Sequence, residues 1–290
     1  MLRLLATAFA CTTLVYAVES EYQVRRALPV SAATRLTLNA EFGSISVQPG
    51  GGRSVEVEAS FRGIPPSRDE FDRMLRDFRL DVTEQGSEVR VNATFQDGWK
   101  PMPFPILLAG HAICRNGHCL EYSAWLRDLE YRVTVPSQFS VDVATSGGPI
   151  SVSGLKGEVN AHTSGGSLHF DRIDGPVNGR TSGGSITLAG VKGRTVVHTS
   201  GGSIHISEVA GDVDASTSGG SISVDRVSGS IRAHTSGGGI SVGGATGAID
   251  ASTSGQRDGI VAGATSAGVP FIDIRREHKS EPAQGCSSKP

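Results

Sequence analysis

Hydrophobic and polar residues recur along the second half of the chain with a fixed period of eighteen residues. The tetrapeptide TSGG begins at Thr145, Thr163, Thr181, Thr199, Thr217 and Thr235, and a degraded copy, TSGQ, begins at Thr253. When each Thr is counted as position one, positions six and eight are apolar and alternate with other side chains, and so do positions fifteen and seventeen. An alternation with period two predicts a β-strand with one buried face.

Glycine marks the turns between these short strands. Position thirteen is glycine in all six TSGG copies, and the Gly-Gly pair after Thr-Ser marks the other turn. Each copy is therefore expected to form one coil of two strands and two turns, stacked in parallel on the next coil. A three-sided hexapeptide helix would need an apolar position twelve, where Lys156 and Asp174 stand, so the pattern favours a flattened coil with two sheets. The prediction is an all-β parallel β-solenoid with aliphatic stripes inside and Ser and Thr hydroxyls facing water.

The N-terminal part, residues 22–140, continues this theme less regularly. Five segments alternate as strands do: TRLTLNA, GSISV, SVEVEASF, EVRVNATF and LEYRVTVP. Residues 67–79 are expected to form a helix, because Ser67 and Glu70 form a capping box. Its apolar residues share one helical face: Phe71, Met74, Leu75 and Phe78. We expect this helix to cover a side or an end of the stack, since open solenoid ends invite aggregation.

The two ends of the chain have different compositions from the repeat. Residues 1–17 place Arg3 before an apolar run that ends in small residues, which predicts a secretory signal peptide. The run is short for a membrane span. The letters AFAC, which end at Cys11, leave a lipoprotein anchor open as an alternative. The regular repeat is expected to cover residues 141–275, and residues 276–290 are expected to form a disordered tail.

Composition and charge restrict the classes of partner. The chain has 27 Lys and Arg against 29 Asp and Glu, a net charge of -2, whereas nucleic-acid binders normally carry a basic excess. Only 6% of the residues are aromatic, so the core must be built from small aliphatic side chains. No later segment is long and apolar enough to predict a transmembrane span.

Residues 96–126 interrupt the strand pattern and are expected to form an inserted loop. In an exported protein Cys114 and Cys119 are expected to form a disulfide. Together with His111 and His118 they also form a zinc-ligand alternative, although the spacing matches no standard zinc site. Three large aromatic residues, Trp99, Phe104 and Trp125, define a candidate partner-binding loop. The alternative is that its apolar residues pack over the solenoid as a lid.

Two outward positions of the repeat carry residues that are common in active sites. Position eighteen holds His162, His198 and His234 on alternate coils, too far apart to share one metal ion. Position sixteen holds Asp214, Arg232 and Asp250 on successive coils. A glycosidase needs paired carboxylates, but the intervening arginine favours an ion ladder on the surface. The sequence contains neither a G-x-S-x-G motif nor a P-loop.

The combination of GSISV, YRVTVP and tandem TSGGSISV…VSGSI units resembles the bacterial DUF4097 adhesin family. The resemblance covers roughly residues 34–273 and is most specific over 145–255. It implies a parallel β-solenoid in or outside the cell envelope. The family supplies no catalytic residues that could be transferred to this chain.

We therefore expect an exported protein, periplasmic or extracellular, that binds or scaffolds at the cell envelope without catalysis or a cofactor. Its partner would be an envelope protein or a repetitive glycan. Two alternatives stay open: a carbohydrate-active enzyme built on a β-helix, and a structural protein that assembles end to end through its coil edges.

Overall fold

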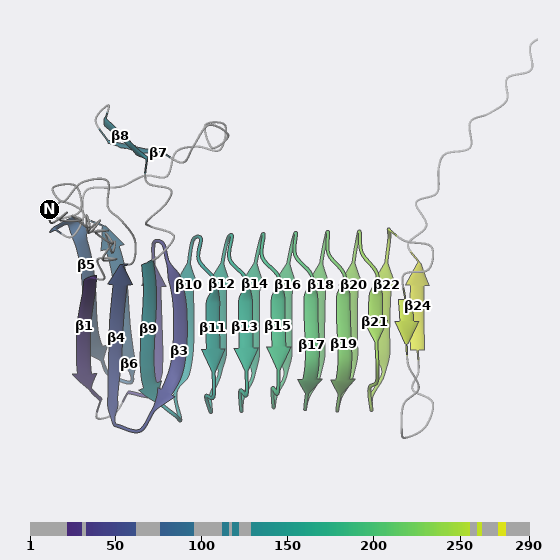
Figure 1. Ribbon diagram of the computed structural model, residues 1–290. Coiled ribbons are helices and arrows are strands. Elements are labelled where there is room, and N and C mark those ends of the chain that lie inside the picture. The colour runs from purple at the N-terminus through teal and green to yellow at the C-terminus, as the bar shows by residue number, and fades with distance from the viewer. Residues whose placement is uncertain are drawn as a thin grey trace, which may run out of the picture.

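A computed structural model describes residues 22–30, 33–61, 76–95, 112–115, 118–121, 129–255, 260–262 and 272–276. Within these residues the chain forms two long sheets that face each other, and a separate hairpin (Figure 1). The all-β solenoid expected from the sequence is confirmed. The predicted signal peptide, residues 1–17, and the predicted tail, residues 276–290, lie outside the described residues except Arg276.

The two long sheets each contain eleven described strands. Sheet A consists, in spatial order, of β1 (Tyr22–Pro29), β4 (Ser54–Phe61), β9 (Leu129–Pro136), β3 (Ser44–Gly50), β11 (Ile150–Ser153), β13 (Leu168–Asp171), β15 (Ile186–Ala189), β17 (Ile204–Val209), β19 (Ile222–Val227), β21 (Ile240–Val242) and β23 (Ile260–Ala262). Sheet B consists of β5 (Phe78–Gln85), β6 (Glu88–Phe95), β2 (Arg35–Ala40), β10 (Ser140–Thr145), β12 (Val159–Thr163), β14 (Val177–Thr181), β16 (Thr195–Thr199), β18 (Val213–Thr217), β20 (Ile231–Thr235), β22 (Ile249–Thr253) and β24 (Ile272–Arg276).

From β10 and β11 to β21 and β22, strand residues pair with their equivalents eighteen positions later. Val159 is opposite Val177 in sheet B, and Ile204 is opposite Ile222 in sheet A, both in parallel register. This register follows from the sequence, because coils of equal length bury their apolar stripes only when equivalent positions stack. The apolar side chains at positions six, eight, eleven, fifteen and seventeen are all buried, none more than 4% exposed.

Residue size is balanced across the core. Phe170 is the one aromatic side chain among the described inward positions of the regular coils, and it is fully buried. The sheet opposite carries Gly179, where an added Cβ would lie 3.0 Å from the Phe170 ring. The glycine therefore makes the room that the phenyl ring fills.

The threonine of each TSGG unit is buried, which corrects the expectation that the threonine hydroxyls face water. Thr199 is fully buried, and its Oγ1 donates to the carbonyl oxygen of Gly184 on the preceding coil at 2.8 Å. The same oxygen accepts the backbone N–H of Gly202 on its own coil at 3.3 Å. Burial of this hydroxyl is tolerated because it both donates and accepts a hydrogen bond. Its two partners are backbone groups of the turns, which have no other partner in the stack. The same donor bond to the preceding coil recurs at Thr163, Thr181, Thr217, Thr235 and Thr253.

In the N-terminal part, spatial order departs from chain order. The coil made by β2 and β3 lies between β6 and β9 on one side and β10 and β11 on the other. After the edge strand β1, the chain therefore forms this coil, then adds β4, β5, β6 and β9 on its outer side, and returns past it to start the regular stack. The outermost strands β1, β4 and β5 run antiparallel to their neighbours. An antiparallel border interrupts the parallel stack at this end (Figure 1).

The helix expected over residues 67–79 is wrong at its C-terminal end. Arg76 and Asp77 are helical, but Phe78 begins strand β5. The remainder of the predicted helix lies outside the described residues. Phe78 is turned into the core, where its ring contacts Phe61 edge to face at a centroid distance of 5.0 Å and Phe95 at 5.3 Å. These contacts, available only in the folded chain, outweigh the local helical pattern.

Candidate binding surfaces of the solenoid

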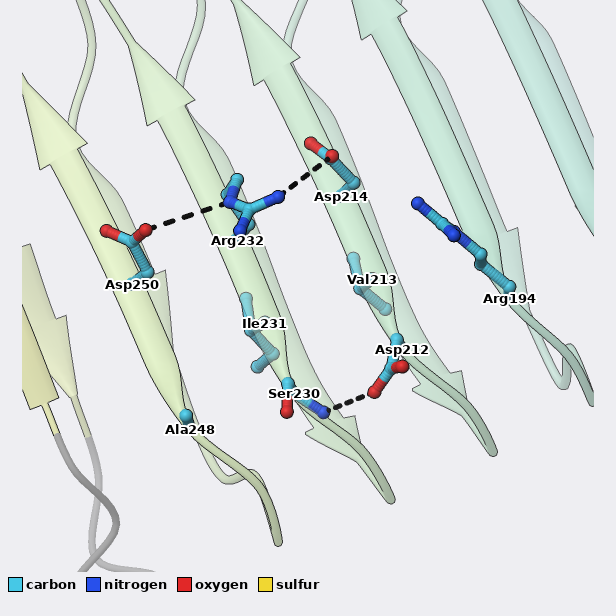
Figure 2. Close-up of a pocket in the computed structure, with 9 residues that line it drawn as sticks. All are labelled: Arg194, Asp212, Val213, Asp214, Ser230, Ile231, Arg232, Ala248 and Asp250. Carbon is cyan, nitrogen blue, oxygen red and sulfur yellow. Dashed lines mark hydrogen bonds and ion pairs between the residues drawn. The ribbon is translucent and has the colours of Figure 1, made fainter.

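The outer face of sheet B carries the ion ladder expected from position sixteen. Arg232 on β20 stands between Asp214 on β18 and Asp250 on β22 (Figure 2). Its guanidinium lies 3.7 Å from a carboxylate oxygen of each aspartate, through Nη1 and Nε respectively. The three side chains meet because equal positions on successive coils are one strand spacing apart. The Arg232 side chain is 69% exposed, so the ladder contributes little to stability and remains accessible to a ligand.

A second polar column runs beside this ladder at position fourteen. The backbone N–H of Ser230 donates to the Asp212 carboxylate at 2.9 Å. Arg194, on the coil before, makes no ion pair with a residue that the structure describes. Together with the ladder these residues line an open depression of about 360 Å³, the one drawn in Figure 2. It offers cationic donors and carboxylate acceptors side by side, which are able to hydrogen-bond with hydroxyl or amide groups.

The histidines of position eighteen lie on the same face, and two of them have serine partners. His198 Nδ1 is 2.8 Å from Ser216 Oγ on the next coil, and His234 Nδ1 is 2.8 Å from Ser252 Oγ. Such a contact fixes the ring orientation and leaves the Nε2 side of the ring for solvent or a ligand. Within the described residues, no three potential metal ligands gather closely enough to hold an ion.

The outer face of sheet A is different, because its central columns are small and mostly uncharged. Serine hydroxyls at position five accept the backbone N–H of the next coil, as Ser185 does from Ser203 at 3.3 Å. Position seven, two residues further along each strand, carries Ser151, His169, Thr187, His205, Ser223 and Ser241. The serine ladder expected from the sequence therefore lies on the surface, whereas the threonine ladder does not.

A cluster of acidic residues lies where the N-terminal strands meet the regular repeat. The Thr37 hydroxyl donates to the Glu88 carboxylate, and this bond holds the pKa of Glu88 below its ordinary value. Burial raises the pKa of the neighbouring Asp142 carboxyl, with Arg35 acting in the opposite direction. Arg35 also forms an ion pair with Glu158 at 2.9 Å. Most of the charge in this cluster is thus satisfied within the protein.

The aromatic residues of the predicted partner-binding loop, Trp99, Phe104 and Trp125, lie outside the described residues. The inserted segment 96–126, expected as a loop, contains two short strands. Cys114 and Cys119 lie on β7 (Ala112–Arg115) and β8 (His118–Glu121), which form the separate two-stranded antiparallel sheet. Their Cα atoms are direct cross-strand partners. This register is compatible with the expected disulfide, which stays a prediction.

No protein-family model matches this chain, and no curated protein sequence matches it. Solved structures similar to it include a "putative adhesin" from Bacteroides fragilis, 13% identical over 88% of this chain and 98% of that one, with a TM-score of 0.42. A "putative adhesin" from Parabacteroides distasonis is 12% identical over 84% and 97% of the two chains, with a TM-score of 0.44. A "putative lipid binding protein" from the same organism is 13% identical over 87% and 97%, with a TM-score of 0.37. None of the described segments contains a helix with the length and hydropathy that a bilayer crossing requires. Membership of the DUF4097 family stays a prediction.

Proposed function

We propose that this protein is an exported, adhesin-like protein that binds or scaffolds at the cell envelope without catalysing a reaction. The observation that carries the proposal is the pairing of charges on the outer face of sheet B. Asp214 and Asp250 both contact Arg232, at 3.7 Å each. A glycosidase needs one carboxyl to transfer a proton and another to attack or activate water. Carboxylates held by an arginine between them are suited to recognition instead.

The construction of the stack supports the same proposal. The N–H groups at the start of each strand donate to the following coil, as Ile186 does to Ser203 at 3.0 Å and Val213 does to Ser230 at 2.9 Å. The outer faces are therefore rigid, and equivalent side chains recur about 4.8 Å apart. A preorganised periodic surface loses little entropy on binding. It can also engage several units of a repetitive partner at once.

The test is retention of the mature chain, residues 18–290, on an insoluble cell-envelope fraction at increasing salt concentrations. Arg232→Ala, combined with Arg194→Ala, should reduce retention several-fold at low salt, because both cations of the Figure 2 depression are lost. Arg226→Ala is the matched control, since Arg226 is also exposed but lies on sheet A. Absence of retention of the native chain at every salt concentration would overturn the proposal.

Two further measurements distinguish the alternatives. Release of reducing ends from a polysaccharide would show a carbohydrate-active enzyme. A light-scattering mass that grows with protein concentration without a plateau would show end-to-end assembly of a structural protein. The proposal expects neither result.

A further inference from the structure

A groove runs along the edge of the solenoid where the chain turns from sheet A toward sheet B. It has a volume of about 520 Å³ and crosses four successive coils. Its two rims are position ten, with Arg172 and Glu208, and position twelve, with Lys156, Asp174 and Lys192. The buried residues of position eleven, Leu155, Ile173 and Val191, lie beneath it. The groove is therefore walled by the stems of long charged side chains, whose methylene groups provide an apolar lining.

The cations of this groove are spaced regularly along the solenoid axis. Lys156 pairs in β-bridge register with Asp174, and Asp174 with Lys192, so the two lysines are two coils apart. Two strand spacings amount to about 9.6 Å. Neither lysine makes an ion pair with a residue that the structure describes. Their ammonium groups are therefore available to a ligand, with the Asp174 carboxylate between them at the same position.

Arg172 adds a third cation between them, in an unusual backbone conformation. Its φ is 51°, in the left-handed region, and within the described residues it is the one non-glycine residue with a positive φ. The equivalent positions on the coils before and after are Gly154 and Gly190, with φ of 70° and 66°. The Arg172 side chain is 75% exposed, and among the residues that the structure describes its one ion pair is with the adjacent Asp171, at 2.9 Å. A strained residue whose side chain does so little for the fold indicates a functional role.

The backbone around the groove cannot receive an added strand. The N–H of Asp174 donates to Leu155 and that of Lys192 donates to Ile173, both at 2.8 Å. On the other rim, the N–H of Arg172 donates to Ala189 at 2.8 Å. Peptide recognition by strand addition needs such groups to be free. An extended peptide in the groove would also leave its own backbone groups facing methylene stems without partners.

We propose that this groove binds a linear acidic glycan, in which carboxylates on alternate sugars contact Lys156 and Lys192. Arg172 contacts the sugar between them, and the C–H faces of the rings lie on the apolar walls. This inference rests on the proposed function and adds to the depression of sheet B a second site with a ligand class of its own.

The experiment measures binding of polygalacturonate to the native mature chain and to two variants. Lys156→Glu with Lys192→Glu should weaken binding at least ten-fold and reduce its dependence on salt. Arg172→Gly should weaken binding several-fold without lowering the thermal midpoint, because glycine adopts this φ without strain. Arg226→Ala is the matched control, since Arg226 occupies the same position ten on a coil beyond the groove and should leave binding unchanged.

Dextran, a neutral glycan, and poly-L-glutamate, an acidic peptide, separate the possible ligands. Both should bind at least ten-fold more weakly than polygalacturonate. Equal binding of poly-L-glutamate would overturn the glycan assignment, and unchanged binding by the lysine double variant would overturn the site. If the native chain is retained on the envelope fraction but does not bind polygalacturonate, this inference fails and the proposed function stands. If the native chain is neither retained on the envelope fraction nor binds polygalacturonate, the inference and the proposed function both fail.

Discussion

The two glycines of each TSGG unit should respond in opposite ways to the addition of one methyl group. In Gly202→Ala the new Cβ would lie 2.1 Å from the carbonyl oxygen of Gly184 on the preceding coil and 2.7 Å from the backbone nitrogen of Ser185. In Gly201→Ala the nearest atom would be the carbonyl oxygen of Ser182, at 3.5 Å, an ordinary contact. The fourth position of this unit therefore tolerates no side chain, whereas the third has room for a methyl group at ordinary contact distances.

The magnitude follows from what must move. Relief of the contact in Gly202→Ala requires the two coils to separate locally by about 1 Å, an overpacking cost of about 1–3 kcal/mol. That separation also strains the bond from Thr199 Oγ1 to Gly184, at 2.8 Å, and the bond from the Ile186 N–H to Ser203, at 3.0 Å. Each contributes about 1 kcal/mol. The expected loss is about 3–5 kcal/mol, whereas Gly201→Ala should change stability by less than about 1 kcal/mol.

The assay is urea unfolding of the mature chain followed by circular dichroism of the strand signal. Gly202→Ala should lower the midpoint, and Gly201→Ala should leave it within error of the native value or raise it slightly. Thermal melts of the same three proteins provide an independent measure. Equal midpoints for the two variants would refute the direct backbone contact between stacked coils at the fourth position.

Three further predictions test the buried hydroxyl, the core and the pH dependence. Thr199→Val should lower the free energy of unfolding by about 1–3 kcal/mol, because two buried backbone groups lose their hydrogen-bond partner. Thr199→Ser keeps the hydroxyl and should retain most of the stability. Equal losses in urea unfolding would argue against the hydroxyl bridge. Ile222→Ala should cost about 2–5 kcal/mol and Ser223→Ala on the outer face about 0.5 kcal/mol or less, so equal losses would invert the assignment of inside and outside. Burial raises the pKa of Asp142 above its ordinary 3.8, so the folded state holds this proton more tightly than the unfolded state and stability falls as pH rises through the raised pKa. Asp142→Asn should therefore raise the thermal midpoint more at pH 7 than at pH 4, and an equal change at both would contradict that sign.

The ion ladder of sheet B could be predicted from the residues that occupy one repeat position on successive coils. The chain order alone places Asp214, Arg232 and Asp250 on successive coils, and the structure confirms their pairing. The groove beside Arg172 could not be predicted in the same way. It depends on the turn conformation at position ten, which the sequence indicates only by the glycines on either side.

Phe78 illustrates why a local pattern can predict the wrong element. It completes an i, i+3, i+4, i+7 set with Phe71, Met74 and Leu75, and it also begins a strand alternation with Leu80. The sequence around Phe78 is therefore compatible with the helical period and with the strand period. Contacts with Phe61 and Phe95, which come from other strands, decide for the strand.

The sequence by itself determined the regular stack, because a strict period of eighteen permits one register in which every apolar stripe is buried. Tertiary structure alone decided the order of strands in the N-terminal part, where the coil of β2 and β3 lies between strands that come later in the chain. The alternation of apolar and polar residues predicts which face of each strand is buried, but it does not predict which other strand pairs with it. Tertiary structure also decided the burial of the threonine hydroxyls, since their acceptor is a glycine carbonyl that arrives only when the preceding coil is in place.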